Sequence, residues 1–212
     1  MNTVDRFICE VDAGLKTLFA KVHAERPLPK PLKSESAIVV PLEENEKAES
    51  IRLMRVNHCG EVCAQALYQG QAMVTKDKSV QQLLTAASNE ERDHLAWCES
   101  RLTELGGKRS YLSPLFYAGS FGLGVVSGLM GDKWSLGFLV ETEKQVEAHL
   151  HDHLSRLSAA DAGSRAILET MREDEIRHGQ SGIDHGGESL PQPVKLAMQG
   201  FSKLMTRTTY WV

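Results

Sequence analysis

Two Glu-x-x-His pairs constrain the fold of this 212-residue chain more than any other feature. The first pair is Glu91 and His94, and the second is Glu175 and His178, 84 residues further along. On an α-helix, residues three positions apart lie on the same face, so each pair directs a carboxylate and an imidazole toward one side. A buried carboxylate is costly unless it is protonated, paired or bound to a cation. Two such pairs on inward faces would therefore place a charged site inside a helical core.

The hydrophobic periodicity around both pairs predicts that they do face inward. Apolar residues recur at steps of three and four over about 80–105, and the first pair interrupts that stripe at its middle. The same pattern surrounds the second pair over about 164–182. We therefore predict two helices that each carry one pair on the core side.

Two further glutamates complete a set of six. Glu143 lies at the centre of an apolar stripe over about 135–158, and Glu61 shares a less purely apolar face over about 42–74. Each half of the chain thus offers one glutamate and then a Glu-x-x-His pair, which predicts two similar helical hairpins around two metal ions. The predicted metal ligands are Glu61, Glu91, His94, Glu143, Glu175 and His178.

Other interpretations of the charged residues are open from sequence. A buried ion-pair network with Arg92, Arg172 or Arg177 would explain one pair better than six groups on four stripes. A histidine cluster at positions 149, 151 and 153 lacks the HExxH pattern of a zinc site. There, His149 is a candidate for orienting a ligand or a substrate group.

Composition excludes several classes of protein. A net charge of −4 argues against a general nucleic-acid binder. Cys9, Cys59, Cys63 and Cys98 form no C-x-x-C pair and are interpreted as reduced thiols. The acidic start of the chain predicts neither a signal peptide nor a mitochondrial transit peptide.

Three segments lie outside the predicted four-helix core. Residues 1–41 are expected to form an amphipathic helix and a proline-rich tether, and residues 42–212 the main domain. Within segment 112–134, an uncharged run is long enough to approach a membrane span, but its glycines and serines weaken that interpretation. A buried crossover between parallel helices is one alternative, and a segment that enters one membrane leaflet is the alternative we favour. The basic and apolar C-terminal helix, 191–212, fits a membrane surface or a plain docking role.

Taken together, these motifs resemble the demethoxyubiquinone hydroxylases, in particular their bacterial branch. The resemblance covers about Ala48 to Val212 and rests on Asn57-His58-x-Gly60-Glu61, Glu90-Glu91-x-Asp93-His94-Leu95, Glu141-Thr-Glu143, Asp174-Glu175-x-x-His178 and Asp184-His185. It implies an all-α, ferritin-like di-iron four-helix bundle with an apolar crossover and an added C-terminal amphipathic helix. The implied ligands are the same six residues.

The resemblance also implies an activity. A di-iron monooxygenase of this family would use two Fe ions and O₂ to hydroxylate the ring of a polyprenylated methoxy-benzoquinol, demethoxyubiquinol, in ubiquinone biosynthesis, with NADH as reductant. It would be peripheral on the cytoplasmic face of the bacterial inner membrane, with the membrane surface and other ubiquinone-biosynthesis proteins as partners. The alternatives are another ferritin-like di-iron protein, either a quinol oxidase or an iron store or sensor.

Overall fold

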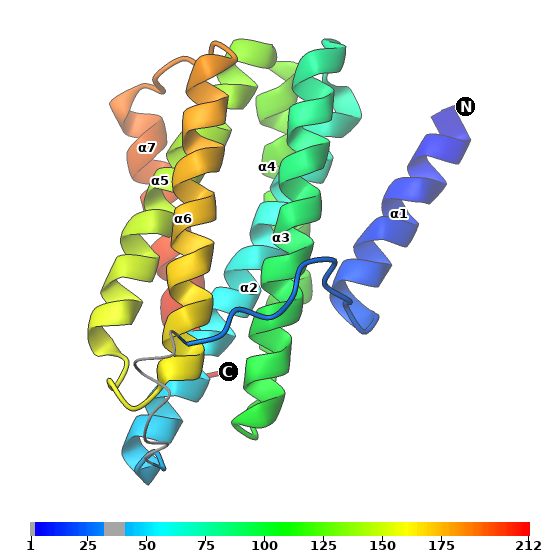
Figure 1. Ribbon diagram of the computed structural model, residues 1–212. Coiled ribbons are helices and arrows are strands. Elements are labelled where there is room, and N and C mark those ends of the chain that lie inside the picture. The colour runs from blue at the N-terminus through cyan, green and yellow to red at the C-terminus, as the bar shows by residue number, and fades with distance from the viewer. Residues whose placement is uncertain (1–2, 32–40) are drawn as a thin grey trace.

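The computed structural model describes residues 3–31 and 41–212, apart from the side chains of residues 3, 4, 6, 7 and 10. All regular structure in these ranges is helical (Figure 1). The helices are α1 (Thr3–Phe19), α2 (Glu44–Val74), α3 (Lys78–Glu104), α4 (Ser113–Leu129), α5 (Asp132–Arg156), α6 (Ala162–Asp184) and α7 (Gln192–Thr209).

Helices α2, α3, α5 and α6 form the bundle that holds the core. Helices α2 and α3 are antiparallel neighbours, α5 and α6 form the second antiparallel pair, and α4 returns alongside α2 so that α5 can run parallel to α3 (Figure 1). This is the ferritin-like arrangement that the sequence predicted. The predicted helix limits agree with the observed ones to within about three residues, as is usual for helix ends.

Side-chain caps define where the two helices with Glu-x-x-His pairs begin. The Asp77 carboxylate accepts hydrogen bonds from the backbone N–H groups of Ser79 and Val80 at the start of α3. The Asp161 carboxylate accepts one from Ser164 N–H at the start of α6. These bonds satisfy amide groups that have no partner within the helix.

The uncharged segment contains a crossover helix that packs on α2, and the predicted entry of this segment into one membrane leaflet stays a prediction. Helix α4 packs so closely on α2 that a Cβ atom at Gly124 would overlap the carbonyl oxygen of Leu67, and one at Gly70 would overlap that of Phe121. Its outer face nevertheless exposes large apolar side chains, among them Leu115 and Leu129. Among the described residues, no helix has the length and apolar character needed to cross a membrane.

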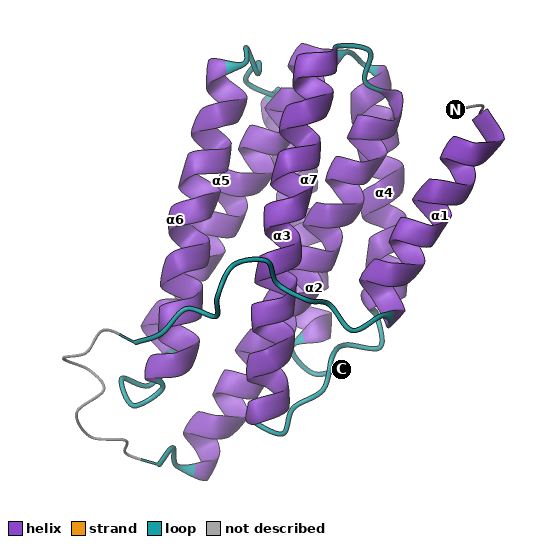
Figure 2. Ribbon diagram, turned by 45° about the vertical axis from the view of Figure 1, so that its right-hand side comes forward, coloured by secondary structure: helices purple, strands orange, loops and turns teal. Residues whose placement is uncertain are grey.

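The remaining helices lie on the outside of the bundle. Helix α1 lies at the edge of the bundle (Figure 2), and its Thr17 hydroxyl donates to Gln65 Oε1 of α2 at 2.9 Å. Helix α7 packs beside α2 and α5. The chain after α1 is extended and crosses α3 toward α6 (Figure 1). The rest of the predicted tether, residues 32–40, falls outside the described residues, and the division at residue 41 stays a prediction.

Candidate metal centre

The six predicted ligands come together in the middle of the bundle. Helix α2 supplies Glu61, α3 supplies Glu91 and His94, α5 supplies Glu143, and α6 supplies Glu175 and His178. All six side chains are buried. They form two four-residue groups, each with ligand atoms within 4.8 Å of one another, and both groups share the glutamates of the two pairs, Glu91 and Glu175. Shared carboxylates between two groups are the geometry of a two-metal site.

Both histidines present Nδ1 to the carboxylates. His94 Nδ1 lies 2.9 Å from Glu91 Oε2 and 3.4 Å from Glu175 Oε1. His178 Nδ1 lies 3.3 Å from Glu91 Oε1 and 3.7 Å from Glu143 Oε1. Each histidine therefore serves one of the two groups.

The outer nitrogen of each histidine faces an acidic residue on the other helix. His94 Nε2 lies 2.9 Å from Asp174 Oδ2, and His178 Nε2 lies 3.3 Å from Glu90 Oε2. Each of these acids directly precedes the glutamate of a pair, so the pseudo-twofold repeat extends one layer outward. His94 Nε2 forms a hydrogen bond with its acid, whereas His178 Nε2 has no hydrogen-bond partner among the described residues. A histidine that donates Nε2–H to a carboxylate leaves its Nδ1 free to bind a metal.

Without a cation, protons balance the buried charges. Burial raises the pKa of Glu61 well above its usual value, and burial with the charge of Glu175 does the same for Glu143. Burial disfavours charge on both histidines, but their carboxylate neighbours outweigh it, so the pKa of His94 is raised and that of His178 rises to about 10. The centre thus holds extra protons where a metal would supply positive charge.

The donor set fits metal ions. Buried atoms that lack a hydrogen-bond partner include Glu91 Oε1, Glu143 Oε2, Glu175 Oε1 and His178 Nδ1. Such atoms are costly, and these four lie in one site where bound cations would satisfy them. Carboxylates with one imidazole per metal are the donors of di-iron carboxylate bundles.

The alternative of a buried arginine network receives no support. Among the described residues, no ion pair joins an arginine to any of the six. Arg177 instead contacts Asp174 and Glu90 on the outer side, and Arg92 donates to Asn89.

Sequence reasoning did not assign Tyr68 to the site. Its hydroxyl donates to Glu143 Oε1, and its side chain is fully buried. Burial and the nearby carboxylates raise its pKa well above the usual value, so it remains a donor. The available signal was its position seven residues after Glu61, on the same predicted helical face.

Contacts among the described residues do not support the expected role of His149 in orienting a ligand or a substrate group. Among the described residues, no hydrogen bond or ion pair links His149 to the six, and its ring packs 3.8 Å from that of His153. His153 is the buried member of this cluster and bonds to Asn57 Oδ1 at 2.9 Å. Glu141, near Glu143 in sequence, lies outside the centre, 3.5 Å from Lys195 Nζ.

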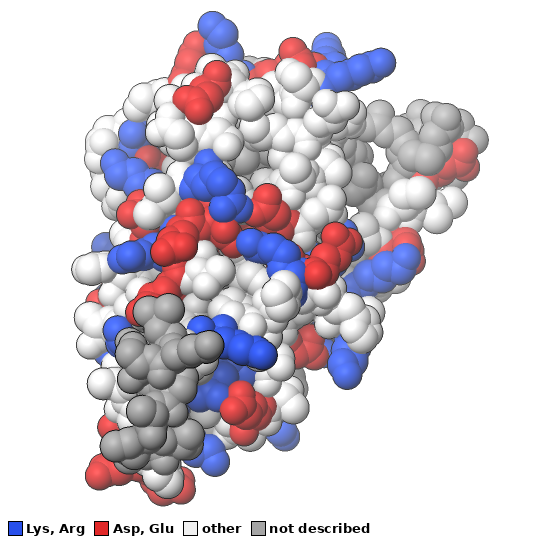
Figure 3. Space-filling view, viewed as in Figure 1, with Lys and Arg blue, Asp and Glu red and all other residues white. Residues whose placement is uncertain are grey.

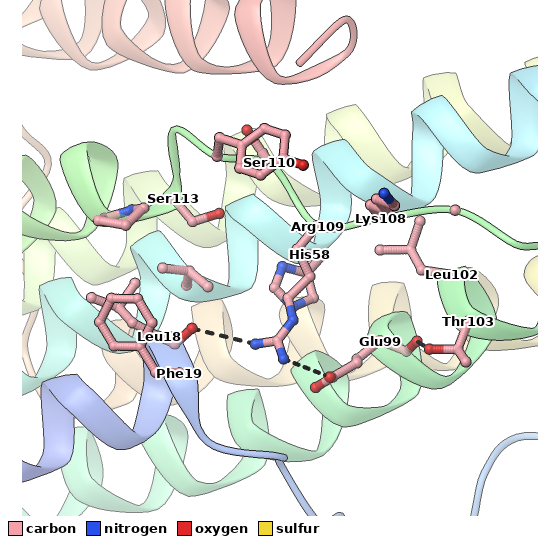
Figure 4. A pocket seen from close by; sticks show the side chains of 14 residues that line it. Leu18, Phe19, His58, Glu99, Leu102, Thr103, Lys108, Arg109, Ser110 and Ser113 are labelled. Carbon is pink, nitrogen blue, oxygen red and sulfur yellow. Dashed lines mark hydrogen bonds and ion pairs between the residues drawn. The ribbon is translucent and has the colours of Figure 1, made fainter.

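Among the cavities that flank the described part of the bundle, two lie next to residues of the predicted motifs. An apolar cavity of about 540 Å³ lies between α2, α4, α5 and α7, and its lining includes Gly60, Ala64, Thr142 and Val146. These residues adjoin Glu61 and Glu143 in sequence. A second cavity, of about 470 Å³, lies beneath the end of α1 and includes His58 (Figure 4).

Comparisons with known proteins agree with this geometry. The family model described as "Ubiquinone biosynthesis protein COQ7" matches residues 48–209. A 3-demethoxyubiquinol 3-hydroxylase of Nitrosomonas europaea is 53% identical over 212 residues, 100% of both chains. Proteins of the same name from Polynucleobacter necessarius subsp. necessarius and Chromobacterium violaceum are each 51% identical, over 99% of this chain and 99% and 100% of theirs. The chain therefore belongs to the COQ7 family of ubiquinone biosynthesis proteins.

Proposed function

We propose that this protein is a di-iron monooxygenase that hydroxylates the ring of demethoxyubiquinol in ubiquinone biosynthesis. The observation that carries the proposal is the buried set of four glutamates and two histidines beside an apolar cavity. The full-length relatives named 3-demethoxyubiquinol 3-hydroxylase supply the reaction and the substrate class.

The six residues would hold two Fe ions, which supply the reduction of O₂ for ring hydroxylation when bound. The chain's own contribution is to hold the ligands and to exclude water. One apolar cluster, with Leu53 and Ile167, lies toward one end of the bundle, and another, with Leu84 and Leu139, lies toward the other. Water exclusion strengthens the electrostatic interactions inside the site. NADH is the proposed reductant.

The apolar cavity is the proposed entry for the quinol. Its lining residues flank the two single glutamates, so a ring in the cavity would approach the centre from the α2 and α5 side. Helices α4 and α7 form its outer wall and supply Leu123 and Phe201. A cavity with this lining matches an apolar prenyl chain better than a charged metabolite.

A membrane surface is the proposed source of that substrate. Exposed large apolar side chains lie on three outer helices: Ile8, Val11, Leu15 and Phe19 on α1, Leu115, Leu123, Val126 and Leu129 on α4, and Leu196 and Leu204 on α7. Such an outer face would bind the interface of a bilayer. We propose a peripheral position on the cytoplasmic face of the bacterial inner membrane. Other ubiquinone-biosynthesis proteins are proposed partners, because water-insoluble intermediates must pass between enzymes there.

The test is reconstitution with lipid vesicles. Protein loaded anaerobically with Fe²⁺ should contain two irons per chain and, with vesicles that carry demethoxyubiquinol, NADH and O₂, should give a quinol with one more oxygen atom by mass spectrometry. Glu175→Ala should abolish both iron loading and product while helix content persists by circular dichroism. Glu173→Ala is the matched control, because Glu173 is an exposed residue of the same helix.

Each alternative predicts a different result. A quinol oxidase would consume O₂ and quinol without adding oxygen to the ring. An iron store would take up and retain far more than two irons per chain. Protein that holds a single zinc ion and no iron after loading would refute the proposal.

A further inference from the structure

The extended segment after α1 brings an arginine against the outer side of the metal centre. Arg26 Nη1 lies 2.7 Å from Asp174 Oδ2 on α6, and its Nε lies 2.9 Å from Asp93 Oδ2 on α3. The backbone N–H of Glu25, the residue before Arg26, donates to Asp93 Oδ1 at 2.7 Å. Both carboxylates are almost fully buried. A guanidinium that bridges two buried carboxylates from two helices is a fixed contact, not a mobile surface pair.

Further contacts hold the segment in place at both ends. The guanidinium carbon of Arg26 lies 4.7 Å from the ring centroid of Trp97, at a distance typical of cation–π contact. At the other end, Arg109 donates to the Leu18 carbonyl oxygen at 3.3 Å and pairs with Glu99 at 2.9 Å (Figure 4). The path of residues 20–26 is therefore determined by contacts with the bundle.

Asp174 connects this segment to a predicted ligand. The Oδ2 atom of Asp174 that contacts Arg26 is also the atom 2.9 Å from His94 Nε2. Its Oδ1 atom accepts from Arg177 at 2.7 Å. Without the guanidinium of Arg26, Asp174 Oδ2 would contact His94 alone. The carboxylate of Asp174 could then rotate about its remaining bond to Arg177.

The two halves of the pseudo-symmetric centre differ in how many arginines hold the acidic residue beside the histidine. The counterpart of Asp174 is Glu90, which is 34% exposed, lies 3.3 Å from His178 Nε2 and contacts only Arg177 among the described arginines. Asp174 is 5% exposed and contacts two arginines. Charged side chains of both signs form a band across the middle of α3 and α6, over the buried centre (Figure 3). We call this band the charged cover, and Arg26 belongs to the half of it that supports His94.

We propose that Arg26 is a positioning residue for the metal centre, and that it holds Asp174 so that His94 presents Nδ1 to its metal ion. The inference rests on the proposed function, because it requires that the six residues bind metal. It adds residues 20–31, which precede the matched family region, to the structure that determines metal affinity.

The test is titration of the metal-free, full-length protein with Co²⁺, followed by visible absorbance in competition with a chelator. Loss of an outer partner of a ligating histidine typically weakens metal binding about 10–100-fold. Because Arg26 acts through Asp174, we expect Arg26→Gln to weaken one of two Co²⁺ sites about tenfold, the low end of that range, and to leave the other unchanged. Arg26→Lys should give a smaller loss, because an ammonium keeps the charge but cannot bridge both carboxylates as a planar fork.

Lys30→Ala is the matched control, since it removes a positive charge from an exposed position of the same segment. Wild-type affinity in Arg26→Gln would overturn the inference, as would an equal loss at both sites accompanied by a lower melting temperature. Wild-type affinity in Arg26→Lys would overturn the bridging role. Wild-type protein that binds no Co²⁺ would refute the proposed function itself, which is a distinct outcome.

Discussion

Metal loading of the centre should release protons, and the structure indicates which residues they leave. In the metal-free site, the pKa of Glu91 and Glu175 is lowered, so both carboxylates are ionised. The raised pKa of the other two glutamates keeps them neutral, and the raised pKa of the histidines keeps them cationic. The buried charge is therefore balanced at two positive and two negative groups.

Metal binding requires four carboxylates and two neutral imidazoles, so about four protons must leave, two per ion, when both positions fill. Four negative carboxylates with two divalent ions again sum to zero, which explains why exchange of protons for metal is favourable in a buried site. Apparent affinity should rise about a hundredfold per ion for each pH unit near neutrality.

Calorimetric titration of metal-free protein with Mn²⁺ or Co²⁺ at pH 7 would measure the release. The observed heat varies with the ionisation enthalpy of the buffer, and the slope gives the proton count. Glu61→Gln at saturating metal should release about three protons, because the amide has none to lose. A wild-type release near zero would refute the charge assignment, and an unchanged count in Glu61→Gln would refute the proton on Glu61.

Three further results are expected. Tyr68→Phe removes the donor to Glu143, so it should lower the unfolding free energy of the metal-free protein by about 1–3 kcal/mol in urea denaturation; unchanged stability would contradict that bond. Gly124→Ala should destabilise the protein by about 1–3 kcal/mol, because the added methyl group would overlap with α2. Gly122→Ala should leave stability unchanged or raise it, because its Cβ would meet no atom within 4 Å. Equal effects of the two substitutions would contradict the close packing of α4 on α2. The pKa of His178 rises to about 10 in the folded protein from about 6.5 in the unfolded chain, so the protonated imidazole stabilises the fold below the unfolded value and this stabilisation is lost as pH rises toward 10. Metal-free protein should therefore be less stable in urea at pH 10 than at pH 6.5. A higher stability at pH 10 would contradict the shift.

The bundle and the six converging residues were predictable because their signal is local. Helical periodicity identifies the inward face of each long helix, and a charged residue in the middle of an apolar stripe is itself informative. Glu61 had the least apolar stripe, yet the internal repeat placed it in the set, and the structure buries it beside Glu91 and His94.

The contacts around the centre were not predictable by the same reasoning. Asp174 and Glu90 look like ordinary polar positions until tertiary packing brings each against a histidine of the other hairpin. Arg26 comes from an extended segment without periodicity, so its partners depend only on the path of the chain. The crossover helix was ambiguous because its glycines suit both close packing and a membrane interface.

The centre has two unlike sides, and this difference would separate the proposed binding of metal from the proposed binding of substrate. On the α2 and α5 side, each helix gives one glutamate, and the adjoining residues line an apolar cavity. On the α3 and α6 side, the outer nitrogens of both histidines face acids that arginines hold in place. A ring that enters from the cavity would meet the centre without disturbing the contacts between the histidines and these acids. Substitutions in the charged cover should therefore act on metal affinity first, whereas substitutions in the cavity wall should act on the quinol and leave metal binding intact.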